Sequence, residues 1–152
     1  MSEKYSKYLG IDYGEKRVGI AVSDENKKYS FSRDFIENDA KFYNQLLKII
    51  KEEKISKIIL GYPLNMSSEK TNQTRKVEDF RSKLENFLKK NSEEAEIIFF
   101  DERFTSRIAE SHLKHSCLKK STRQNKGLID SASAQIILQD YIDKTNNSTI
   151  NN

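Results

Sequence analysis

Apolar residues recur along the chain at two spacings, and the change of spacing divides the sequence into strands and helices. Two short apolar runs come first, in residues 5–12 and 17–23, and a third segment covers residues 28–36. The third segment contains the aromatic residues Tyr29, Phe31 and Phe35. Its alternation is imperfect, and we expect a half-buried strand. Short turns separate the three segments, which predicts an antiparallel meander.

The rest of the chain alternates amphipathic helices with short, continuously apolar strands. Helical spacing of apolar residues predicts helices over residues 39–54, 72–90 and 128–143, and a helix capped by Thr105 or Ser106 is expected to cover residues 105–115. The apolar runs 55–60 and 97–100 predict strands that are buried on both faces. The element order therefore predicts an α/β fold with one five-stranded mixed sheet, in which an antiparallel three-strand meander joins two parallel strands and helices cover both faces.

The pattern contains neither an internal repeat nor an interdomain linker. A chain of 152 residues fits one domain, which we expect to span residues 1–143, followed by a flexible polar tail in residues 144–152. No run approaches the roughly 20 apolar residues of a membrane span, and residues 1–7 lack the apolar core of a signal peptide. The expected location is therefore the cytoplasm, with no membrane partner.

Composition removes several kinds of chemistry. The chain has one cysteine, Cys117, and two histidines, so an intrachain disulfide and a cysteine-rich zinc site are both impossible. The motifs G-x-S-x-G and G-x-x-x-x-G-K do not occur. A net charge of +4 is a modest indication of a nucleic-acid partner. If the chain is an enzyme, carboxylates are its main chemical resource.

Carboxylates follow the ends of two predicted strands and begin the last helix. Asp12 closes the first strand, two residues before Gly14, and Asp101 and Glu102 close the last strand. Asp130 lies in the first turn of the last predicted helix. Because ligand sites of open α/β sheets lie at the carboxyl ends of the strands, we expect these acids to lie together.

Local sequence adds two expectations to this arrangement. Small side chains in residues 131–134 are expected to let the last helix approach the sheet and bring Asp130 near Asp12. Gly14 allows a backbone conformation with positive φ and is expected to leave room for a phosphate. Each acid also has an ordinary explanation, as a turn residue, a solvated strand end or a favourable charge at a helix N-terminus. Their joint placement is what favours a site.

Clustered carboxylates repel one another unless cations neutralise them. Oxygen ligands of this kind suit Mg²⁺ or Mn²⁺. Two such ions about 4 Å apart can activate water and stabilise the leaving oxygen of a phosphodiester. The acids therefore suit metal-dependent phosphodiester hydrolysis, which needs no histidine or serine nucleophile.

At these acids the chain resembles the YqgF family, which has the ribonuclease H-like fold and whose members are described as pre-16S rRNA nucleases and Holliday junction resolvase-like proteins. Four blocks carry the resemblance in order: GIDYG with RVGIAVSD, GYPLNM, DERFTS, and DSASA with IIL. They extend over about residues 8–143. Two positions depart from the family pattern, Tyr62 where Leu is frequent and Ser131 where Lys is common, and neither is an acid.

The resemblance implies a metal-dependent endonuclease, with Asp12, an acid of the Asp101–Glu102 pair and Asp130 as catalytic metal ligands. It also implies maturation of the 5′ end of precursor 16S rRNA. Neighbouring strand residues point to opposite faces, but the apolar run 97–100 does not orient the pair. Glu102 has the longer reach and is favoured, so the predicted Mg²⁺ or Mn²⁺ ligands are Asp12, Glu102 and Asp130.

Basic residues are the predicted nucleic-acid contacts. The segment 114–126 contains five basic residues and no acid, although charge runs of this kind are also common in solvated loops. Two arginines near the acids are expected to hold phosphate or to pair with the carboxylates. The complete predicted set is Arg17, Arg103, Lys119, Lys120, Arg123 and Lys126.

The leading hypothesis is a nuclease acting on precursor ribosomal RNA, free or in ribosomal particles, and three alternatives remain. A Holliday junction resolvase acting on branched DNA would use the same acids in two symmetric active sites, whereas we expect a monomer or weak homodimer. A kinase or actin-like ATPase also uses an Asp-x-Gly hairpin but needs two domains. A non-catalytic RNA-binding module of the same fold would tolerate changes of its acids.

Overall fold

The computed structural model describes residues 6–65, 67–102 and 126–150 and, within the last helix, the side chains of residues 132–146. A five-stranded sheet lies at the centre of this part of the chain, in the order β3-β2-β1-β4-β5. Its strands are β1 (Lys7–Asp12), β2 (Arg17–Ser23), β3 (Ser30–Glu37), β4 (Ile55–Tyr62) and β5 (Glu96–Asp101). The pairs β1–β2 and β2–β3 are antiparallel, and β1–β4 and β4–β5 are parallel. The predicted mixed sheet is confirmed, with β4 directly beside β1 and β5 beyond it.

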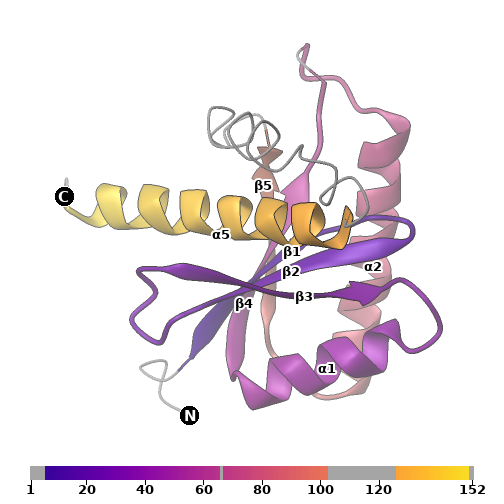
Figure 1. Ribbon diagram of the computed structural model, residues 1–152, viewed down its shortest axis with the longest axis horizontal. Coiled ribbons are helices and arrows are strands. Elements are labelled where there is room, and N and C mark those ends of the chain that lie inside the picture. Colours follow the sequence, from indigo (N-terminus) through magenta and orange to yellow (C-terminus); the bar gives the residue numbers. More distant parts are fainter. Residues whose placement is uncertain (1–5, 66, 103–125, 151–152) are drawn as a thin grey trace.

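Helices cover both faces of the sheet (Figure 1). Helices α1 (Phe42–Glu52) and α2 (Asn72–Lys90) contribute to a core that includes Leu9, Ile11 and Leu60. Helix α5 (Lys126–Ile150) crosses the other face and covers a smaller core that includes Ala21 and Ile59. Neighbouring residues of β4 thus belong to opposite cores, which explains its continuously apolar sequence. The helix predicted over residues 105–115 lies outside the described residues.

Helix α2 has the bounds that the apolar periodicity predicts. Thr71 and Thr74 form a capping box at its start, in which each side chain accepts a hydrogen bond from the backbone N–H of the other. Helix α1 is shorter than predicted, because Asp39 does not cap it. The Oδ1 atom of Asp39 instead accepts a hydrogen bond from Lys41 N at 2.9 Å, in a turn before the helix. No helix in the described part of the chain is long and apolar enough to cross a membrane.

Helix α5 is longer than predicted and continues to Ile150, so residues 144–150 of the predicted polar tail are helical. Hydrogen bonds join this helix to the turn between β2 and β3 and to the start of β3. Gln139 Nε2 donates to the carbonyl of Lys28 at 3.0 Å, and Asn146 Nδ2 donates to that of Lys27 at 3.4 Å. Ser30 Oγ donates to the carbonyl of Gln135 at 2.8 Å. The partners are 105 to 119 positions apart, so the local pattern could not reveal them.

Strand β3 differs from the expected half-buried strand at its first residues. Tyr29 and Phe31 are 62% and 57% exposed, and Tyr29 precedes the strand. The reason is the length of α1. Arg33 donates a hydrogen bond to Glu53, which caps the end of this helix. Phe31 points to the same face of the sheet two residues earlier in β3, past the end of α1, so the helix does not cover it. Strand β3 is also the edge of the described sheet, with β2 as its one strand neighbour.

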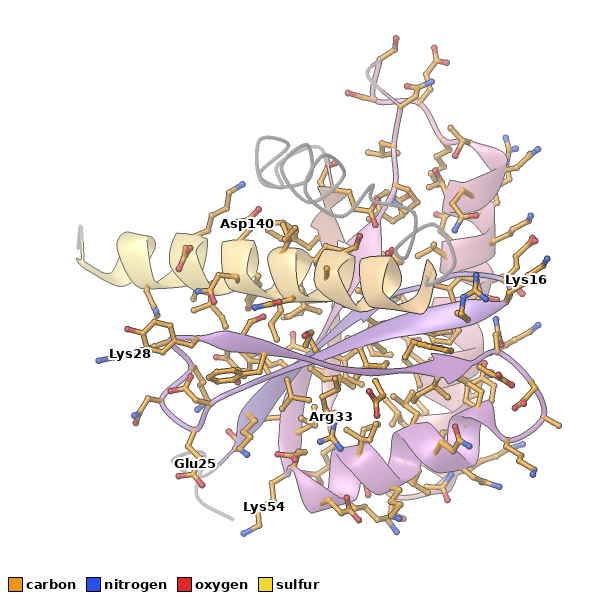
Figure 2. The ribbon with its side chains drawn as sticks, viewed as in Figure 1. Lys16, Glu25, Lys28, Arg33, Lys54 and Asp140 are labelled. Atoms are coloured by element: carbon orange, nitrogen blue, oxygen red, sulfur yellow. The ribbon has the colours of Figure 1, made fainter. Side chains whose placement is uncertain are left out.

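Glu53, at the end of α1, forms hydrogen bonds with residues of both β1 and β3. Its carboxylate accepts from Lys7 Nζ at 2.6 Å and from Arg33 Nη1 at 2.8 Å, and in Figure 2 the Arg33 side chain reaches from β3 toward the end of α1. The hydrogen bond from Lys7 is the main influence that lowers the pKa of Glu53 below its ordinary value of 4.5, and the two positive charges lower it further against the opposing effect of partial burial.

Replacing Glu53 with glutamine is expected to lower the free energy of unfolding at pH 7 by about 1 kcal/mol. A carboxylate with a lowered pKa stabilises the fold above its ordinary pKa, and that stability is lost as the pH falls through the folded-state value. The difference in the free energy of unfolding between the wild type and Glu53→Gln should therefore decrease below pH 4.5. Urea unfolding between pH 7 and pH 3.5 measures it, and a difference independent of pH would contradict the assignment.

Candidate active site

The carboxyl ends of β1, β4 and β5 meet at one edge of the sheet. The register pairs Ile11 with Leu60, and Gly61 with Phe100. Asp12 and Gly61 therefore follow as the next residues along β1 and β4, and Glu102 directly follows the end of β5. Of the predicted acids, Asp12, Asp101 and Glu102 thus lie at this edge, as the sequence indicates.

The two cores show which face of the sheet each strand residue serves. Leu9 and Ile11 pack in the core under α1 and α2, whereas Tyr8 packs against the core under α5. Asp12 has the same parity as Tyr8 and therefore belongs to the α5 face. The same alternation places Gly61 on the α5 face, because Ile59 packs there.

Glu102 shares the α5 face with Asp12. A Cβ atom placed on Gly61 would overlap Oε1 of Glu102 and would lie 2.8 Å from Cδ1 of Ile137 in α5. The missing side chain of Gly61 thus provides the space in which the Glu102 carboxylate lies. Gly61 is a site residue that the strand pattern reveals only as the end of an apolar run.

Asp101 belongs to the opposite face. It pairs with Tyr62, whose ring lies 4.5 Å from that of Phe99, centroid to centroid. Phe99 packs against the core under α1 and α2, and Tyr62 Oη donates to Glu78 of α2 at 3.2 Å. Strand alternation therefore separates Asp101 from Glu102, which the sequence leaves open.

Helix α5 runs antiparallel to β1. The ring of Tyr8 meets that of Tyr141 edge to face, with 5.9 Å between centroids. A Cβ on Gly10 would lie 2.8 Å from Leu138 Cβ and 2.9 Å from the carbonyl oxygen of Ala134. Residue numbers in α5 thus fall as those in β1 rise, and the N-terminal part of α5 lies at the Asp12 end of β1. The close approach of helix and sheet occurs at Ala134 and Gly10.

The remaining predicted site residues are described only in part. Position 130 lies in α5, one turn before Ala134, and the side chain of Asp130 lies outside the described residues. So do Arg103, Lys119, Lys120 and Arg123, and the side chain of Lys126. Arg17 begins β2, and its guanidinium carbon lies 5.9 Å from the centroid of the Phe35 ring. Among the described side chains, no group of three or more His, Cys, Asp or Glu is placed to hold a metal ion.

The turn after Asp12 is held by side chains from outside the hairpin. Asn38 Nδ2 donates to the carbonyl of Gly14 at 2.9 Å, and Gln73 Nε2 donates to that of Tyr13 at 3.2 Å. Lys76 of α2 forms an ion pair with Glu15, and this hydrogen-bonded cation lowers the pKa of the Glu15 carboxyl. The local sequence carries no signal for these contacts.

The positive φ predicted for Gly14 is wrong. Its φ is not positive, and a Cβ atom there would overlap the carbonyl oxygen of Arg17. The carbonyl oxygen of Arg17 therefore occupies the space that a side chain on residue 14 would need. Glycine is needed at this position because the two sides of the turn approach each other closely.

Replacing Gly61 with alanine is expected to slow catalysis about 100-fold, because the new Cβ atom displaces the Glu102 carboxylate. The loss of unfolding free energy should be only about 1 kcal/mol, since the atoms in its way are the flexible ends of two side chains. Gly10→Ala is the matched control. Its Cβ would meet the carbonyl oxygen of Ala134, so we expect the free energy of unfolding of Gly10→Ala to fall by about 3 kcal/mol. A fully active Gly61→Ala protein would contradict this account of the site.

A mixed sheet of this order, with acids at the carboxyl ends of β1 and β5, defines the ribonuclease H-like fold. The chain superimposes on Thermus thermophilus RuvC in complex with a Holliday junction substrate, with a TM-score of 0.58 and 10% sequence identity over 92% of this chain and 96% of that chain. It also superimposes on the Fowlpox virus resolvase in complex with Holliday junction DNA, with a TM-score of 0.52 and 11% identity over 91% of this chain and 98% of that chain. These likenesses establish the fold.

Sequence comparison identifies the family. The family model described as "RuvX: Holliday junction resolvase" matches residues 6–144. A protein of Sulfurihydrogenibium sp. (strain YO3AOP1) is 42% identical over 91% of each chain, and one of Flavobacterium psychrophilum is 38% identical over 90% of this chain and 96% of its own. Both are named "Putative pre-16S rRNA nuclease". The chain therefore belongs to the RuvX family, a family of nucleases, which confirms the resemblance to the YqgF family and removes the kinase and ATPase alternative.

Proposed function

We propose that the protein is a Mg²⁺- or Mn²⁺-dependent endonuclease that processes the 5′ end of precursor 16S rRNA, a step of ribosome biogenesis. The observation that carries the proposal is the placement of Asp12 and Glu102 on one face at the carboxyl edge of the sheet. The names of relatives at 35–42% identity support the substrate. Such a substrate, free or in ribosomal particles, would place the protein in the cytoplasm.

The donor set suits a hard divalent cation. Asp12 and Glu102 offer carboxylate oxygens, with Asp130 as the predicted third ligand, and Mg²⁺ and Mn²⁺ prefer such ligands. The Glu102 carboxylate occupies the space that a Cβ atom on residue 61 would fill, so glycine at this position lets the carboxylate lie against the sheet. When bound, the metal would activate water for attack and stabilise the leaving oxygen of the phosphodiester.

The chain positions these acids on rigid elements. Asp12 is the last residue of β1 and pairs with Gly19 of β2, and the following turn is held by Asn38 and Gln73. Glu102 directly follows β5. Ligands held by strands and by supporting hydrogen bonds keep their positions, and this preorganisation is what metal-assisted hydrolysis requires.

The proposal is tested by incubating the protein with an RNA fragment that spans the 5′ end of 16S rRNA and, in parallel, with a four-way DNA junction. We expect cleavage of the RNA with Mg²⁺ or Mn²⁺, none with EDTA, and recovery when excess metal is added back. Cleavage in EDTA would refute metal dependence. Binding of RNA without cleavage under all conditions would favour the non-catalytic module.

Holliday junction cleavage is the second candidate, and the description of the matching family favours it. Junction resolution uses two symmetric active sites, so it requires a dimer. We predict a monomer or weak homodimer, and sedimentation of the protein with and without the junction tests this. A stable dimer that cuts the junction and leaves the RNA intact would favour the resolvase.

A further inference from the structure

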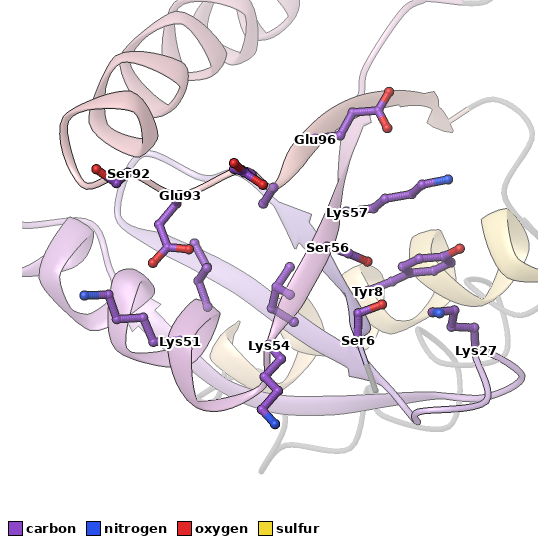
Figure 3. Close-up of a pocket in the computed structure, with 14 residues that line it drawn as sticks. Ser6, Tyr8, Lys27, Lys51, Lys54, Ser56, Lys57, Ser92, Glu93 and Glu96 are labelled. Atoms are coloured by element: carbon purple, nitrogen blue, oxygen red, sulfur yellow. The ribbon is translucent and has the colours of Figure 1, made fainter. Parts of the chain in front are cut away.

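A group of lysines and aromatic rings lies on the α5 face, at the opposite end of β1 from Asp12. The Nζ atoms of Lys27 and Lys57 each lie 5.6 Å from the centroid of the Tyr8 ring. All three residues line a cavity of about 680 Å³, and Figure 3 shows both lysines beside the Tyr8 ring. We call Lys27, Tyr8 and Lys57 the lysine–tyrosine site.

The turn that carries Lys27 is tightly held. Lys27 has a φ of 56°, a left-handed conformation that is unfavourable for a residue with a side chain. Its N–H donates to the carbonyl of Asp24 at 3.1 Å, and Asp24 Oδ1 accepts from the N–H groups of Lys28 and Tyr29 at 2.9 Å. Asn146 of α5 donates to the carbonyl of Lys27 at 3.4 Å. The ammonium group is thus presented from a backbone that these contacts keep in place.

The site brings two like charges to one ring. Since each Nζ atom lies 5.6 Å from the same centroid, the two ammonium groups are at most 11.2 Å apart (5.6 + 5.6). The ring attracts both cations, but they repel each other. Glu96 stands opposite Lys57 in the register, and with Glu93 and Glu94 in the lining of the same cavity it offsets part of this charge. In Figure 3 the two lysines flank the Tyr8 ring, so each ammonium group can donate to the oxygens of a separate phosphate.

A row of rings connects this site to the candidate active site. Tyr141 contacts Tyr8 at 5.9 Å and Phe100 at 6.3 Å, centroid to centroid. Lys144 Nζ lies 5.3 Å from the centroid of the Phe100 ring. Phe100 pairs with Gly61, the residue over which the Glu102 carboxylate lies. Lysines therefore accompany the rings along one face, from the start of β1 to the acids.

We propose that the lysine–tyrosine site binds the phosphate backbone of the nucleic-acid strand that enters the active site. Tyr8 precedes Asp12 by four residues of β1, or about 13 Å. A strand of a few nucleotides spans this distance. Contacts from lysine to phosphate carry no sequence information, so the site positions the substrate and does not select its bases. The identity of the strand rests on the proposed nuclease function, whereas the binding itself does not require cleavage.

The double variant Lys27→Gln/Lys57→Gln tests the proposal. Binding of a 12-nucleotide single-stranded RNA is measured by fluorescence anisotropy in EDTA at several salt concentrations. We expect affinity to fall about 10-fold and the slope of log K against log salt to decrease by about 1.4, or about 0.7 for each lost phosphate contact. The matched control is Lys89→Gln/Lys90→Gln, which removes two exposed charges at the end of α2 and should change affinity less than about 2-fold. Equal effects of the two variants, or no effect of the first, would overturn the proposal.

Three further measurements test the proposal. Tyr8→Leu keeps both charges but removes the ring, and we expect about 3-fold weaker binding, with recovery in Tyr8→Phe. The double variant should lose affinity for single-stranded DNA of the same sequence as it does for RNA, and a loss confined to RNA would contradict a backbone contact.

Asp12→Asn is expected to retain the wild-type salt slope. If Asp12→Asn cleaves normally, the nuclease mechanism fails while the binding result stands, so the two failures can be distinguished.

Discussion

Replacing Asp12 with asparagine is expected to reduce the rate of RNA cleavage by about 1,000-fold, the magnitude typical of losing one strong electrostatic contribution to a transition state. Asparagine has nearly the same shape but no negative charge, so it is a poor ligand for Mg²⁺ or Mn²⁺. The backbone pairing of residue 12 with Gly19 does not depend on the side chain. The free energy of unfolding should therefore change by less than about 1 kcal/mol.

Single-turnover cleavage with saturating enzyme measures the chemical effect of Asp12→Asn, and urea unfolding measures its effect on stability. Asp34→Asn is the matched control, because Asp34 is exposed on β3, at the opposite edge of the sheet from β5. We expect Asp34→Asn to cleave at the wild-type rate. Wild-type activity in Asp12→Asn would show that the carboxylate is not a catalytic metal ligand.

Replacing Glu102 with glutamine is expected to slow cleavage by about 1,000-fold, for the same electrostatic reason. Asp101→Asn, one residue earlier, should change the rate by less than about 3-fold. The difference follows from strand geometry, because Glu102 lies over Gly61 on the α5 face and Asp101 belongs to the face under α1 and α2. The two variants remove the same charge from neighbouring positions, so each is a control for the other.

The Asp101 and Glu102 variants are compared in single-turnover cleavage at several Mg²⁺ concentrations. If Glu102 is a metal ligand, Glu102→Gln should require more Mg²⁺ to reach its residual rate, whereas Asp101→Asn should follow the wild-type curve. A large loss in Asp101→Asn with a small loss in Glu102→Gln would reverse the assignment. Equal losses in both would mean that the effect is not specific to one face of the sheet.

Local patterns along the chain determine most of the secondary structure and the positions of the acids relative to it. Strand β2 and helix α2 have the predicted bounds, residues 17–23 and 72–90. Asp12 ends β1, Asp101 ends β5, and Glu102 directly follows it, as the apolar runs before them predict. These features could be predicted because periodicity and the ends of apolar runs depend on neighbouring residues alone.

The length of α5 depends on distant contacts, and the role of Gly14 depends on the folded path of its own turn. Polar residues 144–150 have no apolar periodicity that predicts a helix, yet α5 continues through them, with Asn146 bonded to the carbonyl of Lys27. Gly14 looks like a residue that needs a positive φ, but its constraint is the close approach of the Arg17 carbonyl. The atoms that hold the end of α5 belong to another part of the fold, whereas the atom that constrains Gly14 lies three residues away in the same turn and depends on the exact path of the backbone.

The pattern of residues shows that a carboxylate pair ends the last strand, but which of the two acids lies on the same face as Asp12 depends on the assembled sheet. Strand β5 is apolar on both faces, so residues 97–100 contain no alternation that orients Asp101 and Glu102. Orientation follows from the pairing of β5 with β4 and from α5, which covers only one face. The space at Gly61 then admits the Glu102 carboxylate. A side chain's face is a property of the assembled sheet, because it depends on which helix packs against which side.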